Sequence, residues 1–227
     1  MMMTSVRRTT VGMVTYGLVH LTVSASMTGT MSKTRLEAFS DGVIAIIITI
    51  MVLELRPPDH GDLAGLWALR SKFLAYVLSF VFLGIYWSNH HHLLHACTHI
   101  TGGVLWANLH LLFWLSIVPF VTAWMGEAHH AYESVPIAAY GVVLLMDAIA
   151  YTILQNRLIA THGRDSKLAR AVGRGGKEWL SLAGYIVAIP LAFIWPVVSY
   201  GLYALIALTW LVPDRRIERQ LNEGKAH

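Results

Sequence analysis

The chain has 227 residues, of which 56% are hydrophobic and only 13% are charged, and its formal net charge is +4. Soluble domains carry about 25% charged residues, so this composition indicates a protein that uses the lipid bilayer as its solvent. It excludes a disordered chain, which needs low hydrophobicity, and it argues against a nucleic-acid binder, which needs a dense Lys and Arg face. The single cysteine excludes a disulfide scaffold.

Six apolar runs approach or reach the length of about 20 residues that a membrane-spanning helix needs. In chain order they are Leu36–Leu55, Phe73–Leu94, Val104–Met125, Pro136–Leu154, Trp179–Trp195 and Val197–Val212. The last two are short and are joined at Trp195-Pro196, which predicts a tight helical hairpin. Proline cannot continue a helix, so Pro57-Pro58 and Pro213 are expected to end the first and sixth helices. The sequence therefore predicts an all-α integral membrane protein with six transmembrane helices per subunit.

The basic residues divide unevenly between the two sides of a six-crossing chain. Four precede the first run, six lie between the fourth and fifth, and four follow the sixth, whereas only Arg56, Arg70 and Lys72 fall on the other side. Because Lys and Arg are retained in the cytoplasm, we expect both termini to be cytoplasmic in a multi-pass protein of the cell membrane. The net positive charge then serves to orient the chain and to contact anionic headgroups.

The first thirty residues admit two interpretations. Arg7-Arg8 followed by the apolar stretch 11–23 is typical of a signal peptide, but cleavage there would place the new N-terminus outside, against the charge asymmetry. The other interpretation is that translation begins at Met31. We therefore expect residues 1–30 to be a dispensable extension, residues 31–213 to form the transmembrane domain, and residues 214–227 to be a cytoplasmic tail.

Polar side chains open the first run, where helical spacing relates Arg35, Phe39, Ser40 and Asp41. Charged and hydroxyl groups at a membrane entry are costly unless they are paired. One interpretation is an interfacial cap, in which Ser40 and Asp41 accept hydrogen bonds from free backbone N–H groups and Arg35 extends to the headgroups. The pattern alone does not distinguish this cap from pairing inside the protein.

Between Gly42 and Leu53 the first run is apolar except for Thr49. Ile46, Ile50 and Leu53 recur at i, i+4 and i+7, so they share one stripe of a helix, which Thr49 borders. A small residue such as Gly42 allows another helix to approach closely. Spacing alone leaves open whether this stripe faces lipid or protein.

The second run ends in a histidine cluster comprising His90, His91, His92 and His95. The i, i+4 spacing of His91 and His95 suits a metal or haem, but no carboxylate or cysteine accompanies them at ligand spacing. Hydrogen bonds to polar groups of another helix are a more economical use of these imidazoles, and Asn108 in the third run needs such a partner. We therefore expect no metal and no cofactor.

Two residues interrupt the apolar runs themselves. Pro119 is expected to kink the third helix near its outer end. Asp147 lies inside the fourth run, where an acid is either a functional residue or a structural one, hydrogen-bonded or protonated. The sequence shows no nucleophile with its base, no phosphate-binding glycine loop and no catalytic carboxylate pair, so we expect no enzyme.

The motif Arg35-x-x-x-Phe39-Ser40-Asp41 at the start of a first membrane helix resembles the signature of the transmembrane protein 175 family of potassium-permeable channels. Further similarity lies in Tyr86-Trp87-x-x-His90-His91, in Asn108 and in Pro119-Phe120. The resemblance covers most of the chain, from about residue 33 to the sixth run. The extension 1–30 departs from the family pattern, in which the signature lies close to the start.

The resemblance implies a homotetramer in which the first helices of four subunits surround a central pore. It assigns the apolar constriction to Ile46, Ile50 and Leu53, and a polar position beside it to Thr49. It also implies a structural network that fixes the first helix, made of Arg35, Phe39, Ser40, Asp41, His90 or His91, and Asn108. The run of three histidines leaves open which of them joins this network.

The expected function is therefore passive conduction by a potassium-preferring cation channel with a hydrophobic constriction, whose partners are K⁺ ions and the bilayer. The chain has no Thr-Val-Gly-Tyr-Gly filter, so we expect weaker selectivity for K⁺ over Na⁺ than a ring of backbone carbonyls provides. The alternative is a proton-coupled carrier that uses Asp147 and the second-helix histidines. The sequence shows no inverted repeat or pair of interrupted helices of the kind carriers use.

Overall fold

The computed structural model describes residues 32–58, 61–127, 133–163, 166, 169 and 176–211. Their regular structure is helical, in the order α1 (Lys33–Leu53), α2 (Leu63–Ala68), α3 (Arg70–His95), α4 (Gly102–Leu115), α5 (Val118–Glu127), α6 (Ser134–His162), α8 (Gly176–Leu191) and α9 (Pro196–Leu211). The extension 1–30 and the tail 214–227 lie outside the described residues, so the predictions made for them stay predictions.

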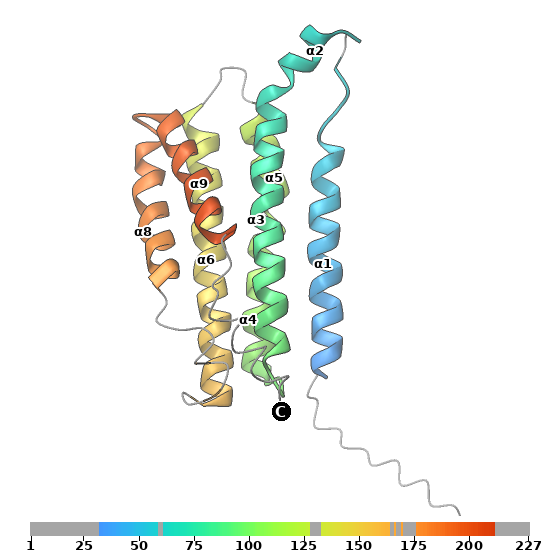
Figure 1. Ribbon diagram of the computed structural model, residues 1–227, viewed down its shortest axis with the longest axis vertical. Coiled ribbons are helices and arrows are strands. Elements are labelled where there is room, and N and C mark those ends of the chain that lie inside the picture. Colours follow the sequence, from blue (N-terminus) through green and yellow to red (C-terminus); the bar gives the residue numbers. More distant parts are fainter. Residues whose placement is uncertain are drawn as a thin grey trace, which may run out of the picture.

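The long helices run side by side along the long axis of the molecule, with α1 at one edge and α8 and α9 at the other (Figure 1). Helix α1 packs mainly against α3, α4 and α5, whereas α6 packs against α4, α5 and α8. Helices α8 and α9 pack against each other, and α9 also reaches α3 and α6. The apolar core therefore lies around α3, α4, α5 and α6, and α1 is attached along one side only.

Four helical segments are long and apolar enough to cross a membrane: α1, α3, α4 with α5, and α6. The last two helices are shorter, since α8 and α9 have 16 residues each. At about 1.5 Å per residue each spans about 24 Å, less than the hydrocarbon core of about 30 Å. They form the hairpin that the sequence predicted, but length alone does not establish them as full crossings.

Helix α1 begins earlier than its apolar run because Ser32 caps it. The Ser32 hydroxyl accepts a hydrogen bond from the backbone N–H of Arg35, at 3.4 Å, as an N-cap residue does. Ser40 and Asp41 therefore lie two turns inside the helix, where the backbone N–H groups are already bonded along the helix. The interpretation of Ser40 and Asp41 as an interfacial cap is wrong.

The third apolar run is two helices, because the chain breaks between α4 and α5 at Ser116 and Ile117. Pro119 has no N–H to donate to the carbonyl of Leu115, and its ring would clash with that carbonyl in a continuous helix. At the break, the Ser116 hydroxyl donates to the carbonyl of Phe113, at 2.6 Å. The expected proline distortion is present, and it interrupts the helix one turn before the proline.

Helix α6 continues two turns beyond the predicted end of its apolar run, to His162. No helix-breaking residue follows Leu154 until Gly163, whose φ of 90° ends the helix in a conformation that favours glycine. The prediction placed the end of the helix at the end of the apolar run, which marks the membrane boundary. The helix itself ends at the first residue whose backbone leaves the helical conformation.

Helix α8 ends at Leu191, four residues before its predicted end. Pro190 lies in its last turn, where it has no backbone N–H to donate, and the chain then turns ahead of Trp195-Pro196. Pro196 then begins α9, at the first helical position that proline tolerates. The short helix α2 was not predicted, because six residues are too few to show a period; Asp62 caps it by accepting from the N–H of Gly65 at 2.7 Å.

Glycine at position 141 allows α6 and α9 to pack closely. A Cβ atom there would overlap the hydroxyl of Tyr203 and lie 3.0 Å from Cγ1 of Ile189. We expect Gly141→Ala to destabilise the protein by about 1–3 kcal/mol through overpacking, measured as the unfolding free energy in detergent. The matched control is Gly201→Ala on α9, whose Cβ would meet nothing within 4 Å. Equal effects of the two substitutions would contradict this account.

Candidate functional site

The outward side of α1 carries a continuous apolar face. Ile46, Ile50 and Leu53 are 58%, 44% and 73% exposed, and Thr49 beside them is also exposed, with its hydroxyl donating to the carbonyl of Ile46 at 2.9 Å. The opposite side of the helix is buried, through Leu36, Ser40, Ile44, Ile47 and Met51. One-sided packing therefore leaves the predicted stripe uncovered within a single chain.

Near the N-terminal end of α1, the same outward face carries small residues. Gly42 and Ala45 are exposed, and a Cβ atom at Gly42 would meet nothing within 4 Å. Small residues let two helix backbones approach closely. The face is thus suited to contact with further helices, and its apolar side chains Ile46, Ile50 and Leu53 follow toward the C-terminal end of α1.

A buried chain of hydrogen bonds joins α1, α4 and α3. The side-chain amide of Asn108 donates to the hydroxyl of Ser40 at 2.9 Å, and its oxygen lies 2.6 Å from Nε2 of His90. An amide oxygen can only accept, so Nε2 of His90 carries the hydrogen. All three side chains are almost fully buried. Of the three consecutive histidines, His90 is therefore the one that contacts Asn108.

The neighbouring polar residues lie nearer the surface. Asp41 accepts a hydrogen bond from the indole N–H of Trp87 at 3.0 Å. The ring of Trp87 stacks on His91 with 6.0 Å between centroids, and His91 stacks on His95 at 6.1 Å. The sequence did not identify Trp87 as the partner of Asp41, because no spacing connects residues on two separate helices.

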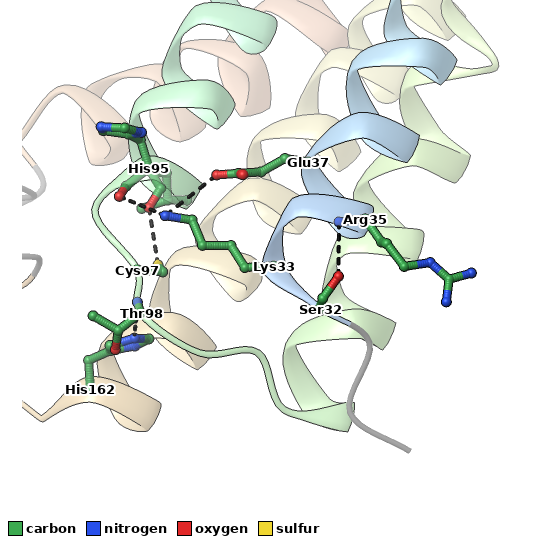
Figure 2. Close-up of polar contacts among 9 residues, drawn as sticks. Ser32, Lys33, Arg35, Glu37, His95, Cys97, Thr98 and His162 are labelled. Carbon is green, nitrogen blue, oxygen red and sulfur yellow. Dashed lines mark hydrogen bonds and ion pairs between the residues drawn. The ribbon is translucent and has the colours of Figure 1, made fainter. Parts of the chain in front are cut away.

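Arg35 and Phe39 are not part of the buried chain of hydrogen bonds. Both side chains are exposed, and that of Phe39 is 49% exposed. Figure 2 shows the guanidinium group of Arg35 directed away from the neighbouring polar residues. The structure thus brings together Ser40, Asn108 and His90, and leaves Arg35 and Phe39 on the outward side of α1.

The start of α1 is tied to the connection between α3 and α4 (Figure 2). The ammonium group of Lys33 donates to the carbonyl of His95 at 3.0 Å and lies 3.6 Å from the carboxylate of Glu37. The backbone N–H of Thr98 in turn donates to Nε2 of His162 at the end of α6, at 3.0 Å. These contacts fix the lower ends of α1, α3 and α6 relative to one another.

Cys97 lies in the same connection, where it is buried and free. Its thiol donates to the carbonyl of Leu93 at 3.1 Å, and burial raises the pKa of the thiol to about 11. The thiolate is the reactive form of cysteine, and a raised pKa favours the unreactive protonated thiol at neutral pH.

A second buried polar cluster joins α3, α5 and α6. The hydroxyl of Ser79 lies 2.7 Å from that of Thr122 and 2.9 Å from that of Tyr140. Thr122 also donates to the carbonyl of Val118 at 2.7 Å. Sequence analysis missed this cluster because single hydroxyl residues within apolar runs are common, and no spacing connects residues on three separate helices.

Asp147 on α6 is fully buried, and neither carboxylate oxygen has a hydrogen-bond partner among the described residues. The interpretation of Asp147 as a structural hydrogen-bond acceptor is therefore wrong. Within the described part of the chain, no group of three or more His, Cys, Asp or Glu side chains is arranged to hold a metal ion.

The sequence matches the family described as endosomal/lysosomal potassium channel TMEM175 over residues 35–119. It is 52% identical over 194 residues to a potassium channel of Chryseobacterium sp. (strain P1-3), across 86% of this chain and 100% of that protein. It is 30% identical over 183 residues to the endosomal/lysosomal proton channel TMEM175 of Mus musculus, across 72% of this chain and 36% of that protein.

Among solved structures, the fold is similar to the crystal structure of a lysosomal potassium-selective channel TMEM175 homologue from Chamaesiphon minutus. The TM-score is 0.70 at 29% sequence identity, across 79% of this chain and 96% of that one. The stretch that matches the family, residues 35–119, contains the α1 motif, His90 and Asn108. The chain is thus a multi-pass helical membrane protein, and it belongs to the TMEM175 family as one of its prokaryotic members.

Proposed function

We propose that the protein is a potassium channel that conducts K⁺ passively across the cell membrane. The relative that is 52% identical over almost the whole chain is named a potassium channel. The observation that carries the proposal is the exposed apolar face of α1, which one chain leaves uncovered at the edge of its bundle. The carrier interpretation is not favoured, because the relatives are named as channels.

The pore of this channel forms where the outward faces of four α1 helices meet in a homotetramer. Ile46, Ile50 and Leu53 then make successive apolar rings that control conduction through width and wetting. Thr49 lies between them and offers hydroxyl oxygen atoms to a passing ion. The exposure of all four residues in one chain supports this assignment.

The hydrogen bonds of Ser40, Asn108 and His90 hold the buried side of α1 against α3 and α4. They fix the rotation of α1 about its own axis, and this rotation determines which residues face the pore. Asp41, two turns into each α1 helix, raises the local concentration of cations. These residues therefore act on the pore indirectly. The hydrogen-bonded three orient α1, and Asp41 attracts the ion.

The membrane arrangement in this proposal has six crossings and cytoplasmic termini. The four long segments support four crossings, and the hairpin of α8 and α9 supplies the last two by locally thinning the bilayer. The basic residues before α1 and after α9 then lie on the cytoplasmic side.

The direct test is flux from liposomes that contain the purified chain. We expect K⁺ to leave loaded vesicles down its gradient until the opposing potential stops it, and the flux to resume when a proton carrier dissipates that potential. Protein-free liposomes are the control, and a pH-sensitive dye records proton movement in parallel without the carrier. A preparation that moves protons but no K⁺ would overturn the assignment of the ion, and one that moves neither would overturn the channel.

A further inference from the structure

The short helix α2 lies apart from the rest of the bundle. It projects beyond the end of α3 in Figure 1, and none of its residues is buried. Its large side chains Leu63, Leu66 and Trp67 are 84%, 60% and 70% exposed. They are spaced i, i+3 and i+4, so they share one side of the helix, and Gly65 and Ala68 lie on the other. The described part of the chain therefore leaves this apolar side of α2 largely uncovered.

The depth of Trp67 follows from its contact with the start of α3. Arg70 is the first residue of α3, and only Leu69 separates it from α2. The guanidinium group of Arg70 lies over the indole of Trp67, 5.5 Å from the ring centroid, and donates to the carbonyl of Trp67 at 3.1 Å. Trp67 is thus level with the first turn of a helix that is long and apolar enough to cross the membrane.

The membrane surface passes through the same turn of α3. The ammonium group of Lys72 lies 3.6 Å from the carboxylate of Glu127 at the end of α5. The exposed apolar side chains of α3 begin at the next residue, since Phe73 and Leu74 are 56% and 53% exposed. Charged side chains collect at the interface, whereas apolar ones face the hydrocarbon. The boundary between headgroups and hydrocarbon therefore lies at about the level of Trp67.

The charge around α2 is complementary to lipid phosphate. Arg56 precedes α2 and Arg70 follows it, and both side chains are exposed. Among the described residues neither forms an ion pair with a carboxylate. Basic side chains near a membrane surface attract anionic headgroups. An indole such as that of Trp67 is favoured at the same level, because its ring is apolar and its N–H group is polar.

From these observations we infer that α2 is an interfacial helix that binds the bilayer surface. Leu63, Leu66 and Trp67 insert between the lipid headgroups, and Arg70 contacts a lipid phosphate beside them. Helices that lie in the plane of the interface bury an apolar side in this way. The inference requires only that α1 and α3 cross the membrane, so it does not rest on the proposed conduction of K⁺.

The test measures which side of α2 faces lipid. Cys97 is the single cysteine of the chain, so a Cys97→Ser background allows one nitroxide label to be placed at Leu66→Cys or at Ala68→Cys. The full chain is studied in vesicles of phosphatidylcholine and phosphatidylglycerol. Molecular oxygen collides with labels in lipid, and a chelated nickel complex collides with labels in water. We expect the ratio of oxygen to nickel collisions to be several-fold higher at position 66 than at position 68.

Two results would overturn the inference. Equal ratios at positions 66 and 68 would show that α2 has no side that faces lipid. Magnetic broadening between labels at position 66, relieved when labelled chain is mixed with an excess of unlabelled chain, would show that a second copy covers this side instead. Either result is independent of whether the vesicles conduct K⁺, so failure here is distinct from failure of the proposed channel.

Two variants test the anchoring groups. In the chain labelled at position 66, Trp67→Ser should lower the collision ratio because α2 loses its largest inserted side chain. Arg70→Gln should also lower it, because the contact with phosphate is lost. The matched control is Trp179→Ser, which removes a 73% exposed indole from α8 and should leave the ratio unchanged. Unchanged ratios in both Trp67→Ser and Arg70→Gln would show that these residues do not hold α2 on the bilayer, and would overturn the inference.

Discussion

Replacing Ile46 with asparagine is expected to raise K⁺ flux from liposomes by about tenfold or more. An apolar ring hinders ions because they lose water within it without gaining other ligands. Four amide groups at this level would supply such ligands, and a barrier lower by about 1.4 kcal/mol is sufficient for a tenfold change in rate. The 58% exposure of Ile46 within one chain means that the substitution should not disturb the core of the subunit.

Val52→Asn is the matched control for this experiment. Val52 is 46% exposed and lies in the same turn as Leu53, but it is offset from the stripe by the helical rotation of about 100° per residue. It should leave the K⁺ flux nearly unchanged. Leu53→Ala provides a second measurement at the other end of the stripe, where a wider ring should also increase the flux.

Two outcomes would contradict the constriction. Equal effects of Ile46→Asn and Val52→Asn would mean that the stripe has no special role, as expected if it faces lipid. Unchanged flux in both Ile46→Asn and Leu53→Ala would place the barrier elsewhere along the path. In either case the channel proposal would stand on the wild-type flux, and only the assignment of the constriction would fail.

The order and type of the helices could be predicted from the sequence, because long apolar stretches directly indicate segments that lie in the bilayer. Each of the six runs contains a helical segment, and predominantly apolar stretches of that length leave little alternative. The ends were less accessible, since α1 begins at a serine cap and α6 ends at Gly163. Both signals lie in polar sequence outside the apolar runs.

The contacts among polar side chains were only partly accessible. The resemblance to the family predicted a network that includes Ser40, Asn108 and one of the histidines. The structure places Ser40, Asn108 and His90 in contact. The bond between Trp87 and Asp41 and the isolation of Asp147 could not be anticipated. Periodicity gives the face of a helix on which a residue lies, but not which neighbouring helix meets that face.

The second large effect is expected from Asn108→Leu, which removes the central residue of a buried polar chain. The hydroxyl of Ser40 and the ring N–H of His90 would both lose their partner. Each buried polar group left unpaired costs about 1–3 kcal/mol, although interhelical hydrogen bonds in membranes average only about 0.6 kcal/mol. We therefore expect a loss of about 1–4 kcal/mol in the free energy of unfolding, measured in detergent by chemical denaturation.

The matched control is Asn156→Leu, which removes an exposed amide from α6 and should change the free energy of unfolding by only a few tenths of a kcal/mol. Flux provides a second measurement. If the polar chain fixes the rotation of α1, then Asn108→Leu should also lower the K⁺ flux of the protein that remains folded, whereas Asn156→Leu should leave it unchanged.

A triple variant separates hydrogen bonding from packing at this position. Combining Asn108→Leu with Ser40→Ala and His90→Phe removes every polar member of the chain, so no donor or acceptor is left unpaired. Replacing all the partners of a buried hydrogen bond by apolar groups costs far less than removing one of them. The triple variant should therefore regain part of the stability lost in Asn108→Leu. The opposite result is a triple variant whose loss in the free energy of unfolding equals the sum of the losses of the three single variants. That result would show that these side chains act by shape alone, and that the polar chain does not orient α1.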